Sequence, residues 1–168
     1  MKLLVIRHAP AEDAAAFASS GQDDALRPLT PAGKRKMKKA AAGLRRVVGR
    51  IECLASSPYR RALQTARILA RKFDDLEVEQ REELVPGRRP AALLRWLKGL
   101  DSAAVVAVVG HEPHLSRCVS WLLTGQERPV LSLGKGGACL LEFEAQVAEK
   151  KATLRWVMRR GQLKRQGA

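Results

Sequence analysis

Three short, largely apolar segments, each running into a polar loop, constrain the fold of this chain more than any other feature. They cover residues 3–6 (Leu-Leu-Val-Ile), 51–55 and 103–109. An apolar run of this length predicts a strand buried on both faces, as in a parallel sheet covered by helices. Stretches in which apolar residues recur at helical spacing separate the three segments. The pattern therefore predicts an α/β domain.

Signals at helix ends place the connecting elements. The pair Thr30-Pro31 offers an N-cap and a first-turn proline, which predicts a helix to about Val48. The segment 56–58 (Ser-Ser-Pro) is expected to cap a helix that reaches about Lys72. Further helices are expected over 90–97 and 114–123, a short strand over 76–78, and a closing hairpin over 138–143 and 153–158. We predict one three-layer α/β/α domain over residues 1–160 with a mainly parallel sheet, followed by a basic C-terminal tail over 161–168.

The charge balance favours anionic ligands. The 168 residues include 31 Lys plus Arg and 17 Asp plus Glu, for a formal net charge of +14. Such a surface attracts anionic substrates and acidic partners. The basic runs lie within helical patterns over 34–46 and 159–165, with no nucleic-acid-binding motif beside them. We interpret them as solvated helix faces and do not expect nucleic acid as the partner.

Cysteine usage and hydropathy indicate the compartment. Cys53, Cys118 and Cys139 lie in apolar surroundings and have neither the spacing of a short disulfide pair nor that of a metal site. The segment before Arg7 is too short for a signal peptide, and no window approaches the roughly 20 apolar residues of a membrane span. We expect a reduced, soluble, cytoplasmic protein that does not contact a membrane.

The polar loops that follow the three predicted strands contain the residues that could take part in a reaction. These loops are Arg7-His8, the segment 56–61 that ends in Arg60-Arg61, and the segment 110–112 that contains His111. The carboxyl ends of parallel strands meet at one crevice, where helix N-termini also favour an anion. Arginine forks can neutralise a phosphoryl group without a metal, and a neutral imidazole can attack its phosphorus. The pattern therefore predicts a phosphate pocket.

Two other chemistries fit the sequence less well. A zinc site built on the two histidines would need a carboxylate from Glu12, Asp13 or Glu112, and no ligand motif links these residues. A cysteine nucleophile would need a phosphate-binding loop, whereas Cys118 lies in an apolar helical pattern. We expect no metal.

Four motifs in order resemble those of the histidine phosphatase superfamily. They are residues 3–9 (LLVIRHA), 27–33 (RPLTPAG), 56–66 (SSPYRRALQTA) and 108–113 (VVGHEP). Ala9 stands where that family usually has glycine. The short length of the chain and the residues of the second and third motifs are most similar to those of the SixA-type bacterial phosphohistidine phosphatases. The resemblance implies a phosphoglycerate mutase-like fold and a reaction that needs no cofactor.

The resemblance also implies roles for individual residues. By motif position His8 is similar to the nucleophile that becomes phosphorylated, Arg7 and Arg61 to the arginines that clamp the phosphate, and His111 to the second histidine that steadies the transition state. Arg27, which begins the second motif, is a further candidate for substrate binding. Arg60 points about 100° away from Arg61 on a helix and is expected to be an exposed charge.

The proton donor is less clearly marked. By resemblance to larger members, Glu83 ahead of Gly87 is the candidate general acid, and Glu82 is its rival. The resemblance to SixA-type members, in which this region is shortened, implies that a strong acid is absent. Without such an acid, the favoured substrates are those whose leaving group departs easily, such as phosphohistidine of a signalling or phosphotransfer protein. A small phosphoanhydride, nucleotide or phosphomonoester is the alternative substrate. A non-catalytic module that binds phosphate or polyanions is the second alternative, and the oligomeric state is left open.

Overall fold

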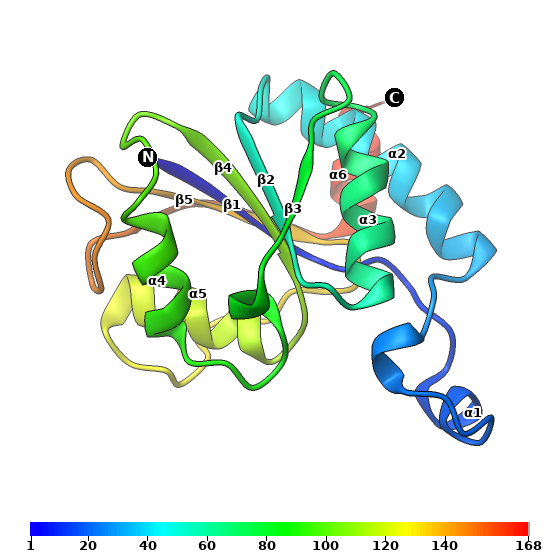
Figure 1. Ribbon diagram of the computed structural model, residues 1–168. Helices are drawn as coiled ribbons and strands as arrows, with labels where there is room; N and C mark the ends of the chain where they lie inside the picture. Colours follow the sequence, from blue (N-terminus) through cyan, green and yellow to red (C-terminus); the bar gives the residue numbers. More distant parts are fainter. Residues whose placement is uncertain (168) are drawn as a thin grey trace.

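A six-stranded mixed sheet forms the centre of the computed structural model, which describes residues 1–167 (Figure 1). The strand order is β3-β2-β4-β1-β5-β6. The first four of these strands are mutually parallel, whereas β5 and β6 run antiparallel at one edge. The strands span Lys2–Arg7 (β1), Cys53–Ser56 (β2), Val78–Gln80 (β3), Val105–Gly110 (β4), Ala138–Glu142 (β5) and Thr153–Met158 (β6).

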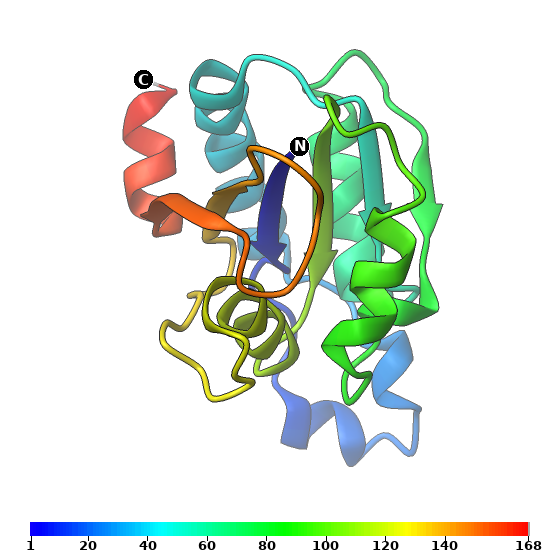
Figure 2. The same cartoon turned by 90° about the vertical axis from the view of Figure 1, so that its left-hand side faces the viewer.

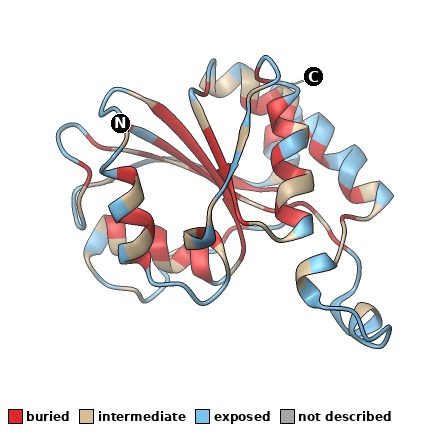
Figure 3. Cartoon of the chain, in the orientation of Figure 1, coloured by how far each residue is buried: buried red, intermediate tan, exposed pale blue. Residues whose placement is uncertain are grey.

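Helices cover both faces of the sheet, as predicted for a three-layer domain. Helices α2 (Pro31–Val48), α3 (Arg60–Ala70) and α6 (Arg160–Gln166) lie on one face, and α4 (Pro90–Leu97) and α5 (His114–Thr124) on the other (Figures 1 and 2). Successive side chains of β1 alternate between the two layers: Leu4 packs into one apolar cluster and Leu3 into the other. The central strands are therefore buried on both sides (Figure 3), which explains their apolar sequences.

The helix-end signals are mostly confirmed, with one correction. The Thr30 side chain accepts a hydrogen bond from the Gly33 amide at 2.9 Å, as expected of an N-cap. Helix α3 instead begins after Tyr59 and has no side-chain cap, so the prediction that the serines before it cap this helix is wrong. The hydroxyl of Ser57 bonds to the ring of His111 at 2.9 Å, so tertiary structure gives it a different partner.

The basic C-terminal segment, expected as a tail over 161–168, is helical up to Gln166, and residue 168 lies outside the described residues. Helix α6 packs closely on α2: a Cβ added to Gly43 would lie 1.7 Å from the Leu163 carbonyl oxygen. Leu163 itself is fully buried. Glycine at position 43 therefore allows the two backbones to approach.

Three short helical segments complete the chain: α1 (Ala14–Ala18), η1 (Asp24–Leu26) and η2 (Glu82–Leu84). The first two extend from the sheet beyond the carboxyl end of β1 (Figure 1). Within residues 1–167, no helix is both long and apolar enough to cross a membrane.

Candidate functional site

The pairing of β1 with β4 brings the two candidate histidines together. Arg7 ends β1 opposite Gly110 at the end of β4, so His8 and His111 each follow the last residue of neighbouring parallel strands. The His8 amide donates to the Gly110 carbonyl at 3.0 Å. The two imidazole centroids lie 5.2 Å apart, and both side chains are buried. The crevice predicted at the carboxyl ends of these strands therefore contains both rings.

The ring of His8 has a defined tautomer. Its Nδ1 lies 2.7 Å from the Ala9 carbonyl oxygen, which can only accept, so Nδ1 carries the proton and Nε2 carries the lone pair when the ring is neutral. Burial lowers the pKa of His8 to about 4, although the bond to Ala9 opposes this, and the positive charges of Arg61, Arg7 and Arg27 lower it further. His8 is therefore neutral near pH 7 and has a nucleophilic nitrogen.

His111 is neutral for similar reasons. Its Nε2 is 2.9 Å from the Ser57 hydroxyl, and its ring packs edge-on against Tyr59 at 5.1 Å. Burial, followed by the charges of Arg61 and His8, lowers the pKa of His111 to about 2. Its buried Nδ1 has no hydrogen-bond partner within residues 1–167. An anion beside this ring would favour the protonated form.

Two arginines of the site share one carboxylate. Arg61, in the first turn of α3, is buried and binds Asp24 through Nη2 to the carboxylate at 2.9 Å and through Nη1 to the backbone carbonyl at 2.8 Å. Arg27 binds the same carboxylate at 2.6 Å. Although partial burial alone would raise it, the two guanidinium groups hold the pKa of Asp24 below its ordinary value. Asp24 therefore neutralises part of the positive charge of these two arginines.

Other arginine donors of this site are not satisfied by the protein. Arg7 donates through Nη1 to the Leu133 carbonyl at 2.8 Å, but its Nε is buried and unpartnered within the described chain. The same holds for Nε of Arg61. Buried N–H groups are normally hydrogen-bonded. Together with the Nδ1 atom of His111, these are buried nitrogen atoms for which the described residues supply no hydrogen-bond partner.

Thr65 supports the backbone beside His8 and was not singled out from the sequence. Its hydroxyl accepts from the Ala9 amide at 3.0 Å and donates to the Arg61 carbonyl at 2.8 Å, and the side chain is fully buried. Its position four residues after Arg61, on the same helix face, was the available signal. Ala9 also fits where the family usually has glycine: among residues 1–167, positive φ at a non-glycine residue occurs only at Asp74, Asp75 and Lys150.

The candidate proton donors are placed differently from the histidines. Glu83 lies on η2, and its carboxylate pairs with Arg81 at 2.9 Å. Glu82 is exposed and lies 3.8 Å from Arg88. No hydrogen bond or ion pair within the described part of the chain joins either glutamate to His8 or His111. Asp24, which lies in a polar stretch without any recognisable pattern, is the carboxylate that contacts the site's arginines.

The metal and cysteine alternatives gain no support from the geometry. No group of three or more His, Cys, Asp or Glu side chains among residues 1–167 is arranged to hold a metal ion. Glu112 accepts hydrogen bonds from the Ser116 hydroxyl at 2.7 Å and from the Leu133 amide at 3.0 Å. Burial raises the pKa of Cys118 and Cys139 to about 12, so neither is a thiolate near neutral pH.

Comparisons with known proteins identify a family and solved structures of the same fold. The model of the histidine phosphatase superfamily (branch 1) matches residues 3–85. An uncharacterized protein of Picosynechococcus sp. is 34% identical over 139 residues, which make up 82% of this chain and 82% of that protein. The protein histidine phosphatase SixA, solved in complex with tungstate, superposes with a TM-score of 0.79 at 25% identity, over 97% of this chain and 99% of its own. A phosphoserine phosphatase mutant of Entamoeba histolytica, solved with phosphoserine, shares the fold with a TM-score of 0.67 at 19% identity, over 93% and 95% of the two chains.

Proposed function

Because this chain belongs to branch 1 of the histidine phosphatase superfamily, we propose that it is a metal-independent phosphatase that transfers a phosphoryl group first to His8 and then to water. The tautomer of His8 carries this proposal. Its Nδ1–H is held by the Ala9 carbonyl, so the lone pair is on Nε2, and its lowered pKa keeps the ring neutral. A neutral imidazole among arginines is the arrangement that phosphoryl transfer to nitrogen requires.

The reaction proceeds in two steps. In the first, the Nε2 lone pair of His8 forms a bond to phosphorus while the bond to the leaving group breaks, and the leaving group takes the bonding electrons. In the second, water attacks phosphorus, His8 departs with the electrons of the P–N bond, and the water proton passes to solvent or phosphate. The enzyme regains its starting state, and inorganic phosphate is released.

The cationic groups stabilise the transferring phosphoryl group. The Nε atoms of Arg7 and Arg61 and the Nδ1 of His111 are the unsatisfied nitrogens of the site, and they donate to the equatorial oxygens. The charge of the phosphate raises the pKa of His111, so this ring can take up a proton and donate it to an oxygen. Substrate also competes with Asp24 for Arg61 and Arg27, because a phosphate dianion attracts the two guanidinium groups more strongly than one carboxylate.

Phosphohistidine of a signalling or phosphotransfer protein is the substrate that we propose. The P–N bond of phosphohistidine breaks without a strong enzymic acid, whereas expulsion of an alkoxide needs one. The pairing of Glu83 with Arg81, with no contact to either histidine, supports a substrate of the first kind. Similarity to SixA at 25% identity points the same way. The alternative is a small phosphomonoester, the kind of substrate that the phosphoserine phosphatase of the same fold is named for.

Turnover of two substrates tests the proposal. Wild type and His8→Ala are assayed with a phosphohistidine peptide and with p-nitrophenyl phosphate, with EDTA present throughout. We expect wild type to hydrolyse the peptide faster, and His8→Ala to lose both activities. Acid-labile phosphate on wild type, absent from His8→Ala, identifies the phosphoenzyme.

Two adjacent arginines provide a matched control. Arg61→Ala should lose most of the activity because the phosphate loses a buried ligand, whereas Arg60→Ala should keep it because Arg60 is exposed. Full activity of His8→Ala, or activity that EDTA abolishes, would contradict the mechanism. Faster turnover of p-nitrophenyl phosphate would favour the small-molecule substrate, and phosphate binding without turnover of either would indicate a non-catalytic module.

A further inference from the structure

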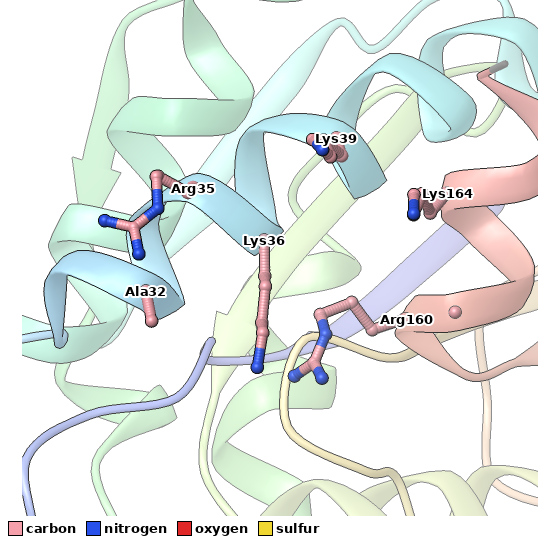
Figure 4. A pocket seen from close by; sticks show the side chains of 7 residues that line it. Ala32, Arg35, Lys36, Lys39, Arg160 and Lys164 are labelled. Carbon is pink, nitrogen blue, oxygen red and sulfur yellow. The ribbon is translucent and has the colours of Figure 1, made fainter.

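A groove of about 380 Å³ between α2 and α6 is lined mainly by cationic side chains (Figure 4). Arg35, Lys36 and Lys39 come from α2, and Arg160 and Lys164 come from α6. No acidic residue contributes to the lining. The two sides of the groove are more than a hundred residues apart in the sequence, so only the packing of α6 on α2 creates this concentration of charge.

The chain provides no counter-charge for this groove. Neither α2 nor α6 contains an aspartate or glutamate, and no ion pair within residues 1–167 involves any of its five cations. Like charges also recur at four-residue spacing, as in Arg35 with Lys39 and Arg160 with Lys164, and such spacing of like charges destabilises a helix. The close contact of the helices at Gly43 then brings the two positive faces together. An anionic occupant would relieve this repulsion.

The groove borders the segments that hold the nucleophile. At one rim, a Cβ added to Gly33 in the first turn of α2 would lie 2.0 Å from the carbonyl oxygen of Pro10, two residues after His8. At the other, Arg160 donates to the Lys135 carbonyl at 3.1 Å. The next amide, that of Gly136, donates to the carbonyls of Arg7 and His8 at 3.2 and 3.0 Å. In Figure 4 the ends of the Lys36 and Arg160 side chains point toward one another across the groove.

We propose that this groove docks an acidic segment of the substrate protein, adjacent to the phosphohistidine that is hydrolysed at His8. The inference rests on the proposed function, because it assigns a second contact to the same phosphoprotein. Carboxylates fit the lining better than nucleic acid does, since no aromatic side chain is present on which a base could stack. The groove is also short and bounded by two helices, whereas a nucleic-acid backbone is tracked by an extended basic stripe.

Docking of this kind has a kinetic signature. Complementary charges act mainly on association and on partner choice, and salt weakens them. The groove should therefore lower KM for acidic phosphoproteins and leave the chemical step unchanged. Removing cations from it should not destabilise the fold, since the groove is a source of repulsion.

Two phosphohistidine peptides of equal length test the inference. One has glutamates flanking the phosphohistidine, and the other has glutamines at the same positions. The groove variant is Lys36→Glu with Lys39→Glu, and the matched control is Lys98→Glu with Lys151→Glu, which alters two exposed lysines outside the groove by the same total charge. All proteins are assayed at low and high salt, with p-nitrophenyl phosphate as the substrate that needs no docking.

We expect wild type and the control to prefer the acidic peptide by about tenfold in kcat/KM at low salt. The groove variant should lose this preference through KM, keep its activity on p-nitrophenyl phosphate, and unfold at a urea concentration no lower than wild type. Equal hydrolysis of both peptides by wild type would overturn the docking inference and leave the proposed function intact. An equal loss of preference in the control variant would also overturn it, because general charge would then be the cause.

Two further outcomes are decisive. If wild type hydrolyses neither peptide, the proposed substrate is wrong. The inference is then decided by measuring the binding of the unphosphorylated acidic peptide by fluorescence anisotropy. Binding that depends on the groove supports the inference, and absence of binding overturns it. If a single-stranded oligonucleotide competes for the groove more strongly than the acidic peptide, the partner is a nucleic acid and the proposal of an acidic protein segment is wrong.

Discussion

Replacing Thr65 by valine should damage both stability and catalysis through one hydrogen bond. Valine has nearly the same shape, so packing changes little, but the Ala9 amide loses its 3.0 Å acceptor in a fully buried setting. An unsatisfied buried amide costs about 1–3 kcal/mol. The lost bond to the Arg61 carbonyl adds less, because that carbonyl lies in a helix, where the backbone amide four residues on can satisfy it.

The effect on catalysis follows from the position of Ala9. Its carbonyl holds the Nδ1–H of His8, so a looser Ala9 peptide also loosens the ring that we propose as the nucleophile. A small displacement of a reacting group has a large effect on rate, and we expect kcat to fall on the order of tenfold. Urea denaturation gives the free energy of unfolding, and steady-state kinetics give kcat and KM.

Thr65→Ser is the control for this prediction. It keeps the hydroxyl and removes one methyl group, so it should lose some stability but retain most of the activity. If Thr65→Val matches wild type in both measurements, the Ala9 amide is satisfied in another way. If Thr65→Ser lowers kcat as much as Thr65→Val does, packing rather than the hydrogen bond is the cause, and the reasoning fails.

Three more predictions concern ionisation, charge competition and helix packing. Burial lowers the pKa of His8 to about 4 and that of His111 to about 2, so an NMR titration should find both rings neutral at about pH 5. For the same reason the free energy of unfolding should fall as the pH drops below about 6.5, which is the pKa of histidine in the unfolded chain. A titration midpoint near 6.5 for either ring would contradict this. Asp24→Asn should strengthen inhibition by inorganic phosphate roughly twofold to fivefold, because the site's arginines lose a competing anion, and unchanged inhibition would show that Asp24 does not compete. Gly43→Ala should lower the free energy of unfolding, measured in urea, by about 1–3 kcal/mol, since the new Cβ meets a backbone carbonyl at 1.7 Å. Gly161→Ala, whose Cβ has nothing within 4 Å, should raise it by up to about 1 kcal/mol. Equal stability of the two variants would argue against close packing of α2 and α6.

Local signals were sufficient for the fold and for the approximate place of the site. The apolar run before Arg7 and the one before Gly110 are the sequences of strands buried on both faces, and both strands lie at the centre of the sheet. Parallel neighbours end at the same edge, so the residues that follow them had to meet. The nearness of His8 to His111 therefore follows from the sequence pattern alone.

Residues held by distant partners could not be foreseen in this way. The capping role expected for the serines before α3 was wrong, because the helix begins after Tyr59 without a side-chain cap, and the Ser57 hydroxyl bonds to the Tyr59 amide and to His111, 54 residues further along the chain. Glu83 is near the same sheet edge, yet its carboxylate is paired with Arg81. A polar residue on a loop has no periodic pattern that reveals its partner, so sequence reasoning could place these side chains only approximately.

The sequence by itself determined the order of the six strands and of helices α2 to α5, the family, and which strand ends carry the histidines, because hydrophobic periodicity and short motifs are local properties. Only the tertiary structure decided that Asp24 pairs with Arg61 and that Thr65 binds the Ala9 amide. It also decided that α6 closes a basic groove against α2. These features depend on side chains that are far apart in the chain and close in space, and packing of the whole domain is what brings them into contact.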